Sequence, residues 1–368
     1  MDEATFRKFL AATQSVYGPI ELDTYTIPPS WFPPLLTEGE GRYLWTDAFG
    51  VVNFLTLFKS TGDRRYLIFA ADLITAVHEC LGRTRDRTRR LPGATDESPL
   101  AGGLRIGKKD ELGPDGDGQY HHYLTLWMFA LNRMAVATGQ EWYNKQAINL
   151  AKSIHDKFVY QRHSSRPRMY WKMSMDLSKP LTTSEGNLDP IDGYLTLRLL
   201  KKTAEENHMG GGGDKLDEEL RDYKKIVDKK WAGYESSDAL DIGMTLWSAH
   251  SSLGCQEEDW ARGLCERMLH CLDYYNQLKT RPHKYRLAFR EFGLVLGLRT
   301  YATQEPSTTE ADMLYSLAEE IVCGWEKWDP LPEARKTPTD LKPITLVMYC
   351  AALHPGAFTK GYLEHRLT

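Results

Sequence analysis

Most of this 368-residue chain follows a helical pattern of apolar residues, and the helices fall into pairs joined by short turns. The first pair is predicted at 45–60 and 65–81, separated by the turn Thr61-Gly62-Asp63. Four further pairs with the same pattern are predicted at 119–138 with 141–158, 190–205 with 216–231, 239–253 with 258–277, and 287–303 with 310–328. Such hairpins bury their apolar faces by packing against one another, which constrains the fold more than any other feature of the chain.

One helix without a partner remains at each end of the chain, at 3–17 and 341–353. If these two helices pack together they form a sixth pair, and six hairpins can close into a ring. We therefore predict an all-α fold, an (α/α)6 toroid, with one domain spanning 1–368 and helix 3–17 closing the ring against helix 341–353. An open solenoid of the same hairpins is the alternative, and it would need capped ends.

A glycine recurs near the start of the first helix in four of the five internal pairs, at Gly50, Gly193, Gly243 and Gly293. Small residues at these positions would let the first helices of neighbouring pairs approach closely. The whole arrangement resembles the six-hairpin glycosidases and the N-acylglucosamine 2-epimerase group, which are single-domain toroids of similar length. The resemblance covers the architecture of the chain and matches no catalytic motif of either group, so it implies a fold and a carbohydrate-active enzyme class without assigning residues.

The composition excludes several other classes of protein. The formal charge is −4, with 46 basic against 50 acidic residues, which argues against nucleic acid or a membrane surface as partner. No stretch approaches the roughly 18 consecutive apolar residues of a membrane-spanning helix, and the charged first helix is unlike a signal peptide. The six cysteines form no C-x-x-C pair, so we expect reduced thiols, a cytoplasmic protein, no metal and no cofactor.

Two connections are much longer than the turns, at 83–118 and 160–189, and loops of this length are often functional. The first contains Arg105 and Lys108 among glycines and apolar residues. The second contains the alternating segment 169–176, which predicts a short β segment and carries Trp171 and Lys172. Both lead into the first helix of a pair, so we expect them to lie at the same end of the ring.

The starts of the first helices are the second place where chemistry is expected, because their free N–H groups suit anionic or hydroxyl-rich ligands. Asp residues at these positions also serve as N-caps, which is the alternative interpretation. Of the adjacent His121 and His122, about 100° apart on a helix, one is expected to face the centre. The candidate substrate-binding residues are Trp45, Asp47, Arg105, Lys108, Gln119, His121, His122, Trp171, Lys172 and Glu185.

Four functions are compatible with these residues. The favoured one is a hydrolase of a glycosidic or unsaturated uronyl bond, with Asp192 as base, Asp176 as an acid whose pKa is raised beside Trp171, and Asp189 in either role. A sugar 2-epimerase-type isomerase would instead use His121 or His122. The others are a toroid acting on a hydrophobic secondary-metabolite ligand and a non-catalytic scaffold. The expected partner is a small-molecule or oligosaccharide substrate.

Overall fold

The computed structural model describes residues 1–20, 41–113, 115–206, 215–254, 258–304 and 308–364. The chain divides into two compact units, one formed by 26–230 and the other by 1–25 with 231–368. Each unit is described by itself.

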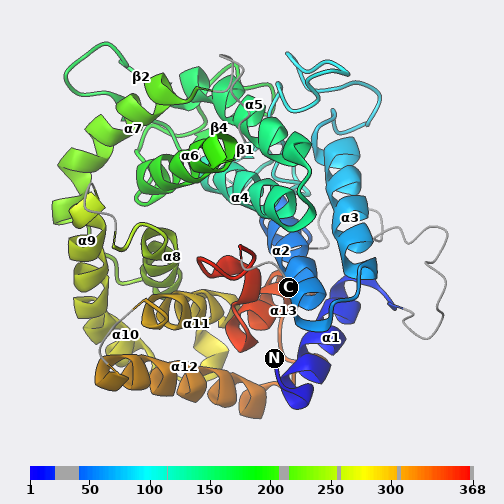
Figure 1. The fold of residues 1–368 in the computed structure, drawn as a ribbon, viewed down its shortest axis with the longest axis vertical. Helices are drawn as coiled ribbons and strands as arrows, with labels where there is room; N and C mark the ends of the chain where they lie inside the picture. The colour runs from blue at the N-terminus through cyan, green and yellow to red at the C-terminus, as the bar shows by residue number, and fades with distance from the viewer. Residues whose placement is uncertain (21–40, 114, 207–214, 255–257, 305–307, 365–368) are drawn as a thin grey trace. The chain divides into compact units, whose positions relative to one another are not determined.

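The unit 26–230 consists of three helix pairs (Figure 1). In each pair the two helices pack against each other, and the first helices also pack side by side in the order α2, α4, α6. The pairs are α2 (Leu44–Thr61) with α3 (Arg65–Leu81), α4 (His121–Thr138) with α5 (Glu141–Phe158), and α6 (Asp189–Glu206) with α7 (Asp217–Lys230). The first helices are apolar on most sides because helices cover them on more than one face.

Short strands occupy the two long connections of this unit. Strand β1 (Gln119–Tyr120) pairs antiparallel with β4 (Lys172–Met173), and β2 (Val159–Tyr160) pairs antiparallel with β3 (Arg168–Met169). The predicted strand at 169–176 is therefore interrupted. Its first part pairs with the strand that follows α5, and its second part pairs with the strand that precedes α4.

The unit formed by 1–25 and 231–368 also contains three pairs. Here α11 packs against both α8 and α13 (Figure 1), and the second helices are α9, α12 and α1. The bounds are α8 (Ala239–His250), α9 (Asp259–His270), α10 (Leu272–Leu278), α11 (Ala288–Ala302), α12 (Thr308–Trp328), α13 (Lys342–Leu353) and α1 (Glu3–Tyr17). The predicted helix at 258–277 is divided at Cys271, where α9 ends and the short α10 begins.

The prediction that glycines let first helices approach closely is confirmed between α8 and α11. A Cβ atom at Gly243 would lie 2.2 Å from the carbonyl oxygen of Gly293, and one at Gly297 would lie 2.1 Å from that of Gly243. Real Cβ atoms do not come this close to backbone oxygens, so both positions require glycine at this helix separation.

Helix α1 packs against α13, so the helix at the start of the chain and the last long helix form a pair within one unit. Phe9 of α1 is fully buried, and its carbonyl oxygen accepts hydrogen bonds from Thr13 and from the Cys350 thiol of α13. Closure of a complete ring by this pair stays a prediction.

Phe9→Ala should destabilise the protein by about 3–5 kcal/mol, because it opens a cavity between α1 and α13. Lys8→Ala is the matched control on the same helix, since Lys8 forms only a surface ion pair with Glu326, worth about 0–1 kcal/mol. Denaturant unfolding of both variants measures the difference. Equal stability of the two variants would contradict a structural role for the α1–α13 contact.

Candidate active site

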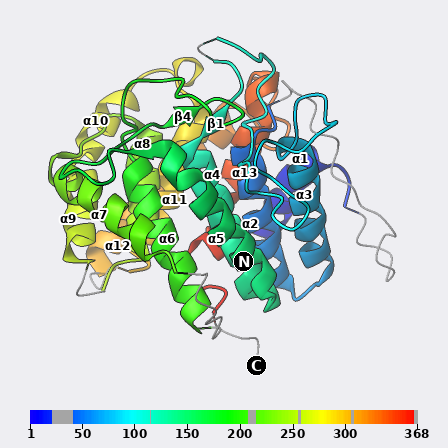
Figure 2. The same ribbon diagram turned by 90° about the horizontal axis from the view of Figure 1, so that it is seen from above.

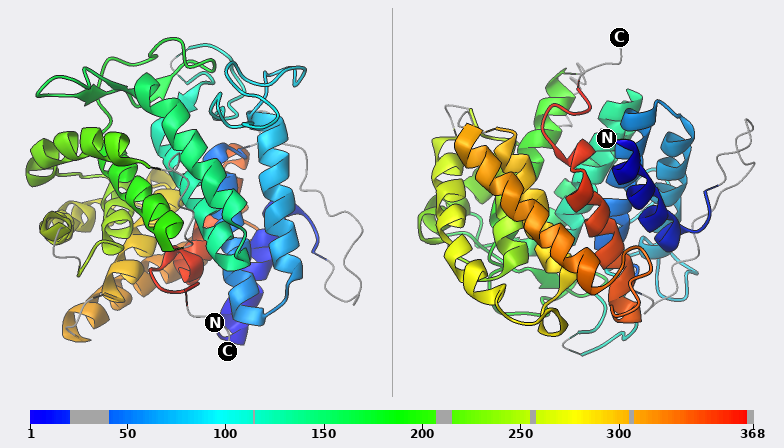
Figure 3. Two further views of the ribbon diagram at one scale, coloured as in Figure 1. Left: turned by 45° about the horizontal axis from the view of Figure 1, so that its top comes forward. Right: turned by 90° about the horizontal axis from the view of Figure 1, so that it is seen from below.

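Both long connections of the unit 26–230 lie where α2 and α4 begin. The backbone N–H of Leu44, at the start of α2, donates to the carbonyl oxygen of Ile106 at 3.1 Å, and that of His121, at the start of α4, donates to Trp171 at 3.0 Å. Figure 2 and the left view of Figure 3 show the connections at the same end of these helices. The expectation that segments 102–108 and 169–189 lie at the starts of the first helices is therefore confirmed within this unit.

A buried carboxylate faces two histidines at this end. Asp189, the first residue of α6, has a side chain only 8% exposed. Its Oδ1 lies 3.3 Å from His122 Nδ1 and 3.6 Å from His121 Nδ1, both at the start of α4. We call Asp189, His121 and His122 the Asp189 cluster. It joins the first turns of two neighbouring helices.

The charge of Asp189 depends on those histidines. Burial disfavours the ionised carboxyl, but the two imidazoles that face it, His121 and His122, outweigh burial and hold the pKa of Asp189 well below its usual range. Gly186 adds to the enclosure, since a Cβ atom there would lie 1.9 Å from Asp189 Oδ2. The site therefore contains a nearly solvent-free carboxylate whose lowered pKa favours the ionised form.

The two histidines differ in access to solvent. The His121 side chain is 1% exposed and the His122 side chain 29% exposed. Because His122 Nδ1 faces Asp189, its Nε2 is the nitrogen directed away from the carboxylate. His122 is thus the member of the cluster that can exchange a proton with a ligand.

Aromatic rings surround His122. Its ring stacks on Tyr120 with centroids 5.5 Å apart and an angle of 21°, and it meets the edge of Tyr123 at 4.8 Å. Trp45 lies 5.9 Å from His122, and Trp171 lies 5.3 Å from Tyr120. We call Trp45, Tyr120, Tyr123 and Trp171 the aromatic cluster. Flat rings of this kind present apolar faces to the C–H groups of a sugar ring.

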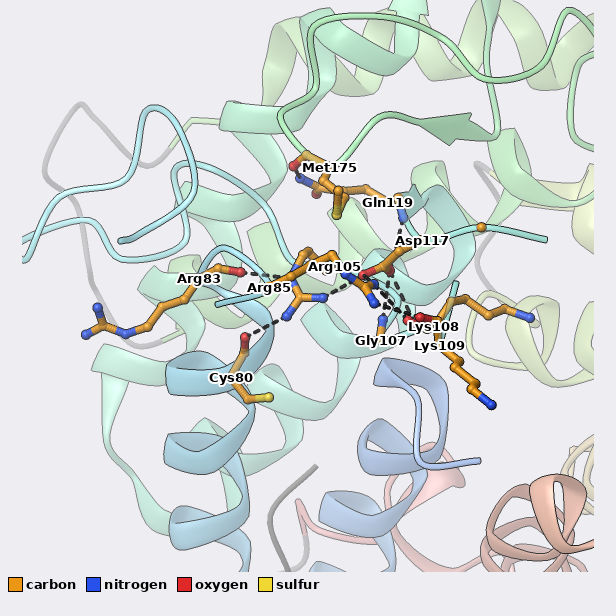
Figure 4. A network of polar contacts seen from close by, with 12 residues as sticks. Cys80, Arg83, Arg85, Arg105, Gly107, Lys108, Lys109, Asp117, Gln119 and Met175 are labelled. Carbon is orange, nitrogen blue, oxygen red and sulfur yellow. Dashed lines mark hydrogen bonds and ion pairs between the residues drawn. The ribbon is translucent and has the colours of Figure 1, made fainter. Parts of the chain in front are cut away.

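Arg105 was expected to contact a ligand, and the structure gives it another role. Its side chain is fully buried, and its Nη1 lies 2.5 Å from Asp117 Oδ2. Figure 4 shows the two side chains facing each other. It also donates to the carbonyl oxygens of Cys80 and Arg83, while Arg85 reaches the same carboxyl of Asp117. Arg105 therefore fixes the first long connection, because a buried guanidinium needs these partners.

Gln119 and Lys172, two further expected ligand-binding residues, hold the two connections together, and Asp47 has a structural partner of its own. Gln119 donates to the carbonyl oxygens of Gly102 and Met175, and its own side-chain oxygen accepts from Leu104. Lys172 is buried and donates to Gly116 at 2.9 Å, with its ammonium 5.0 Å from the Tyr120 ring centroid. Asp47 is buried in an ion pair with Arg42.

The remaining expected residues are more exposed. Lys108 is half-buried, with its ammonium 5.0 Å from the Tyr43 ring centroid, and Glu185 pairs with Arg168 at 3.1 Å. Asp192 is half-buried in the first turn of α6, one turn after Asp189.

The expectation of a raised pKa at Asp176 is wrong. Asp176 is exposed and accepts hydrogen bonds from Ser174 at 2.6 Å and from Ser178 at 2.8 Å. These bonds, that from Ser174 first, lower the pKa of Asp176. Sequence reasoning placed it in dry surroundings beside Trp171 and overlooked the serines on both sides, which are typical of a carboxylate that closes a turn.

Sequence reasoning also missed Tyr223 of α7, which is buried and whose hydroxyl lies 2.6 Å from His121 Nε2. Tyr223 has the helical spacing of a core residue, with Ile226 and Val227 following it. That pattern indicates burial and gives no signal of a hydrogen-bond partner on another helix.

Comparisons with known proteins identify the fold. No family model matches the sequence, and no curated protein matches it. Among solved structures, a D-mannose isomerase matches 96% of this chain and 98% of its own, with a TM-score of 0.57 and 10% identity. The GH76A alpha-1,6-mannanase from Salegentibacter sp. HEL1_6 matches 95% of this chain and 99% of its own, with a TM-score of 0.56 and 12% identity. An unsaturated glucuronyl hydrolase specific for heparin matches 96% of both chains, with a TM-score of 0.57 and 10% identity.

These structures define the class of fold. The chain shares the (α/α)6 toroid fold of these structures, as its helix pairs predict. At this level of identity the likeness concerns the fold, and the chemistry has to be argued from the residues. Within the described part of the chain, no helix is long and apolar enough to cross a membrane, and no three His, Cys, Asp or Glu residues are grouped as a metal site would require.

Asp117→Ala should destabilise the protein by about 3–5 kcal/mol, because it leaves the guanidinium of Arg105 buried without its counter-charge. Glu79→Ala is the matched control: it also removes one carboxylate from an arginine, but the Arg83–Glu79 pair lies at the surface and is worth about 0–1 kcal/mol. Urea unfolding of both variants measures the two values. A loss of 1 kcal/mol or less for Asp117→Ala would remove this ion pair from the structural core.

Proposed function

We propose that this chain is an enzyme acting on a carbohydrate, with the Asp189 cluster and the aromatic cluster as its active site. The observation that carries the proposal is His122, a partly exposed imidazole held by a buried, ionised carboxylate and surrounded by aromatic rings. An imidazole in this setting is a general acid or base, and the rings supply a surface for a sugar. The (α/α)6 fold, which it shares with a mannose isomerase and with two glycoside-cleaving enzymes, supports the same class.

Within that class, the geometry favours proton transfer at a carbon beside a carbonyl, which is the chemistry of a sugar isomerase or 2-epimerase. His122 Nε2 would remove the proton and return it, while Asp189 keeps the other proton on Nδ1 and stabilises the imidazolium that forms. Such a reaction needs one group that alternates between acid and base near pH 7, and histidine alone has an ordinary pKa suited to this.

Hydrolysis of a glycosidic or unsaturated uronyl bond is the second candidate. Asp192 supports it, because this half-buried carboxyl lies in the first turn of the helix that begins with Asp189. A hydrolase of this kind also needs a carboxyl that holds its proton near neutral pH. Asp176, the expected acid, has a lowered pKa, and this observation places hydrolysis second.

We also propose a cytoplasmic protein whose partner is a small-molecule or oligosaccharide substrate. The support is the state of the cysteines: Cys80, Cys265, Cys271, Cys323 and Cys350 are free thiols, while Cys255 lies outside the described residues. Buried free thiols are typical of reducing compartments.

His122→Gln should lower turnover by about 10²–10⁴-fold, because it removes the acid–base group. The melting temperature, measured on the same preparation, reports separately the stability lost with the contact to Asp189. The assay is deuterium uptake at C2 and product formation, followed by NMR in D2O with mannose, glucose, cellobiose and N-acetylglucosamine. His163→Gln, at an exposed histidine of the loop between β2 and β3, is the matched control and should leave turnover unchanged. Wild-type turnover retained in His122→Gln would contradict the proposed acid–base role.

Asp192→Asn separates the two candidate reactions. If the chain hydrolyses a glycosidic or uronyl bond, this variant should lose activity by orders of magnitude on mannan oligosaccharides or unsaturated uronyl disaccharides, since an amide cannot accept the proton. If the chain is an isomerase and Asp192 only stabilises the start of α6, turnover should remain within a few-fold and stability should fall by about 1 kcal/mol or less. Product analysis and thermal unfolding of the same preparation give both values. Full hydrolytic activity of Asp192→Asn would exclude this residue as the base.

A further inference from the structure

Tyr223 reaches the Asp189 cluster from a helix that carries none of its members. It lies on α7, is 2% exposed, and its hydroxyl lies 2.6 Å from His121 Nε2. Its ring is enclosed between His121, with centroids 5.7 Å apart, and His155 of α5, with centroids 5.0 Å apart. The tyrosine is therefore fixed in position as well as hydrogen-bonded.

Helix α6 provides the space for this contact. A Cβ atom at Gly193 would lie 2.6 Å from Tyr223 Cε1 and 3.1 Å from His121 Cε1. The helix that begins with Asp189 thus has a glycine one turn later, at the position where Tyr223 and His121 meet. The same glycine was expected to admit a neighbouring helix, and in the structure it admits this pair of side chains.

The positions of the polar atoms determine which atom carries each proton. His121 Nδ1 lies 3.6 Å from the ionised Asp189, so a lone pair on Nδ1 would face a negative charge, whereas an N–H would be attracted to it. A neutral His121 therefore carries its proton on Nδ1, and Nε2 is left as an acceptor. Burial, and then the charge of Asp189, raise the pKa of Tyr223, so its phenol keeps its proton and can donate it to Nε2.

We propose that Tyr223 is a positioning residue of this active site: its hydroxyl donates to His121 Nε2 and so fixes the His121 proton on Nδ1, facing Asp189. Asp189 then faces the N–H of His121 at 3.6 Å and accepts a hydrogen bond from His122 at 3.3 Å, and this bond orients the ring of His122. The consequence for catalysis rests on the proposed function, whereas the arrangement of protons is a property of the free protein.

The first test is the position of the His121 proton in the free protein. In protein labelled with ¹⁵N-histidine, the couplings and shifts of the two ring nitrogens at neutral pH distinguish the tautomers. We expect the neutral form of His121 to carry its proton on Nδ1 and to show an Nε2 resonance displaced by an accepted hydrogen bond. A proton on Nε2, or a doubly protonated ring, would overturn the proposal. This measurement needs no variant and no substrate.

Tyr223→Phe tests the donor, because it removes the hydroxyl and keeps the ring between His121 and His155. In this variant the ¹⁵N resonance of His121 Nε2 should move to the position typical of an imidazole nitrogen that accepts no hydrogen bond. Tyr66→Phe is the matched control: Tyr66 is 1% exposed in the same unit, and its hydroxyl has no hydrogen-bond partner among the described residues. An Nε2 resonance unchanged in Tyr223→Phe, or changed equally in Tyr66→Phe, would overturn the proposal.

Turnover adds a readout that a purely structural role would not move. With any sugar that the wild type converts, Tyr223→Phe should lower kcat by about tenfold or more with little change in KM, because the substrate does not touch the tyrosine. Tyr66→Phe should retain the wild-type kcat. If the NMR results are as expected and no sugar is converted, the proposed function fails while the assignment of Tyr223 stands. If kcat is unchanged in Tyr223→Phe, the positioning role fails.

Discussion

Asp189 is a carboxylate with almost no access to water, and it remains charged because two histidines face it. An unpaired charge in such a place would cost several kcal/mol, so the first turns of α4 and α6 have to stay in register with each other. Other features of this end of the unit serve the same contact. Gly186 leaves room beside the carboxylate, Gly193 leaves room for Tyr223, and the pairing of β1 with β4 brings the carbonyl oxygen of Trp171 to the N–H of His121.

The cations of the long connections illustrate how burial changes the role of a residue. In the sequence, Arg105 and Lys172 stand out as ligands for a sugar carboxylate or hydroxyl. In the structure, both are buried and hydrogen-bonded to the backbone, and Arg105 shares Asp117 with Arg85. Polar groups with all their needs met by the protein stabilise the loops that border the site. His122 differs from them, because 29% of its side chain remains exposed and can meet a ligand.

The toroid fold by itself leaves the reaction open. A mannose isomerase, a mannanase and an unsaturated glucuronyl hydrolase share it with this chain at 10–12% identity, so the same fold is found in an isomerase and in hydrolytic enzymes. In this chain the candidate residues for the reaction lie at the starts of the first helices. They include Asp189 facing two histidines, and the half-buried Asp192. Substitution of His122 therefore tests the isomerase reaction, and substitution of Asp192 tests hydrolysis.

The sequence by itself determined the helix pairs, their boundaries to within a few residues and the all-α fold, because apolar periodicity, turn glycines and pair repetition are local properties. It also predicted a candidate site at the starts of α4 and α6, where Asp189, His121 and His122 stand. Only the tertiary structure decided which of those residues meet. Asp176 was expected in dry surroundings, but the serines beside it in the sequence hydrogen-bond to it at the surface. Arg105 was expected to contact a ligand, but it is buried against Asp117, twelve residues away. Tyr223 gave no local sign of its partner on another helix. Burial and hydrogen bonding arise from contacts between segments, so the charge and the role of a side chain follow from the fold and not from its place in the chain.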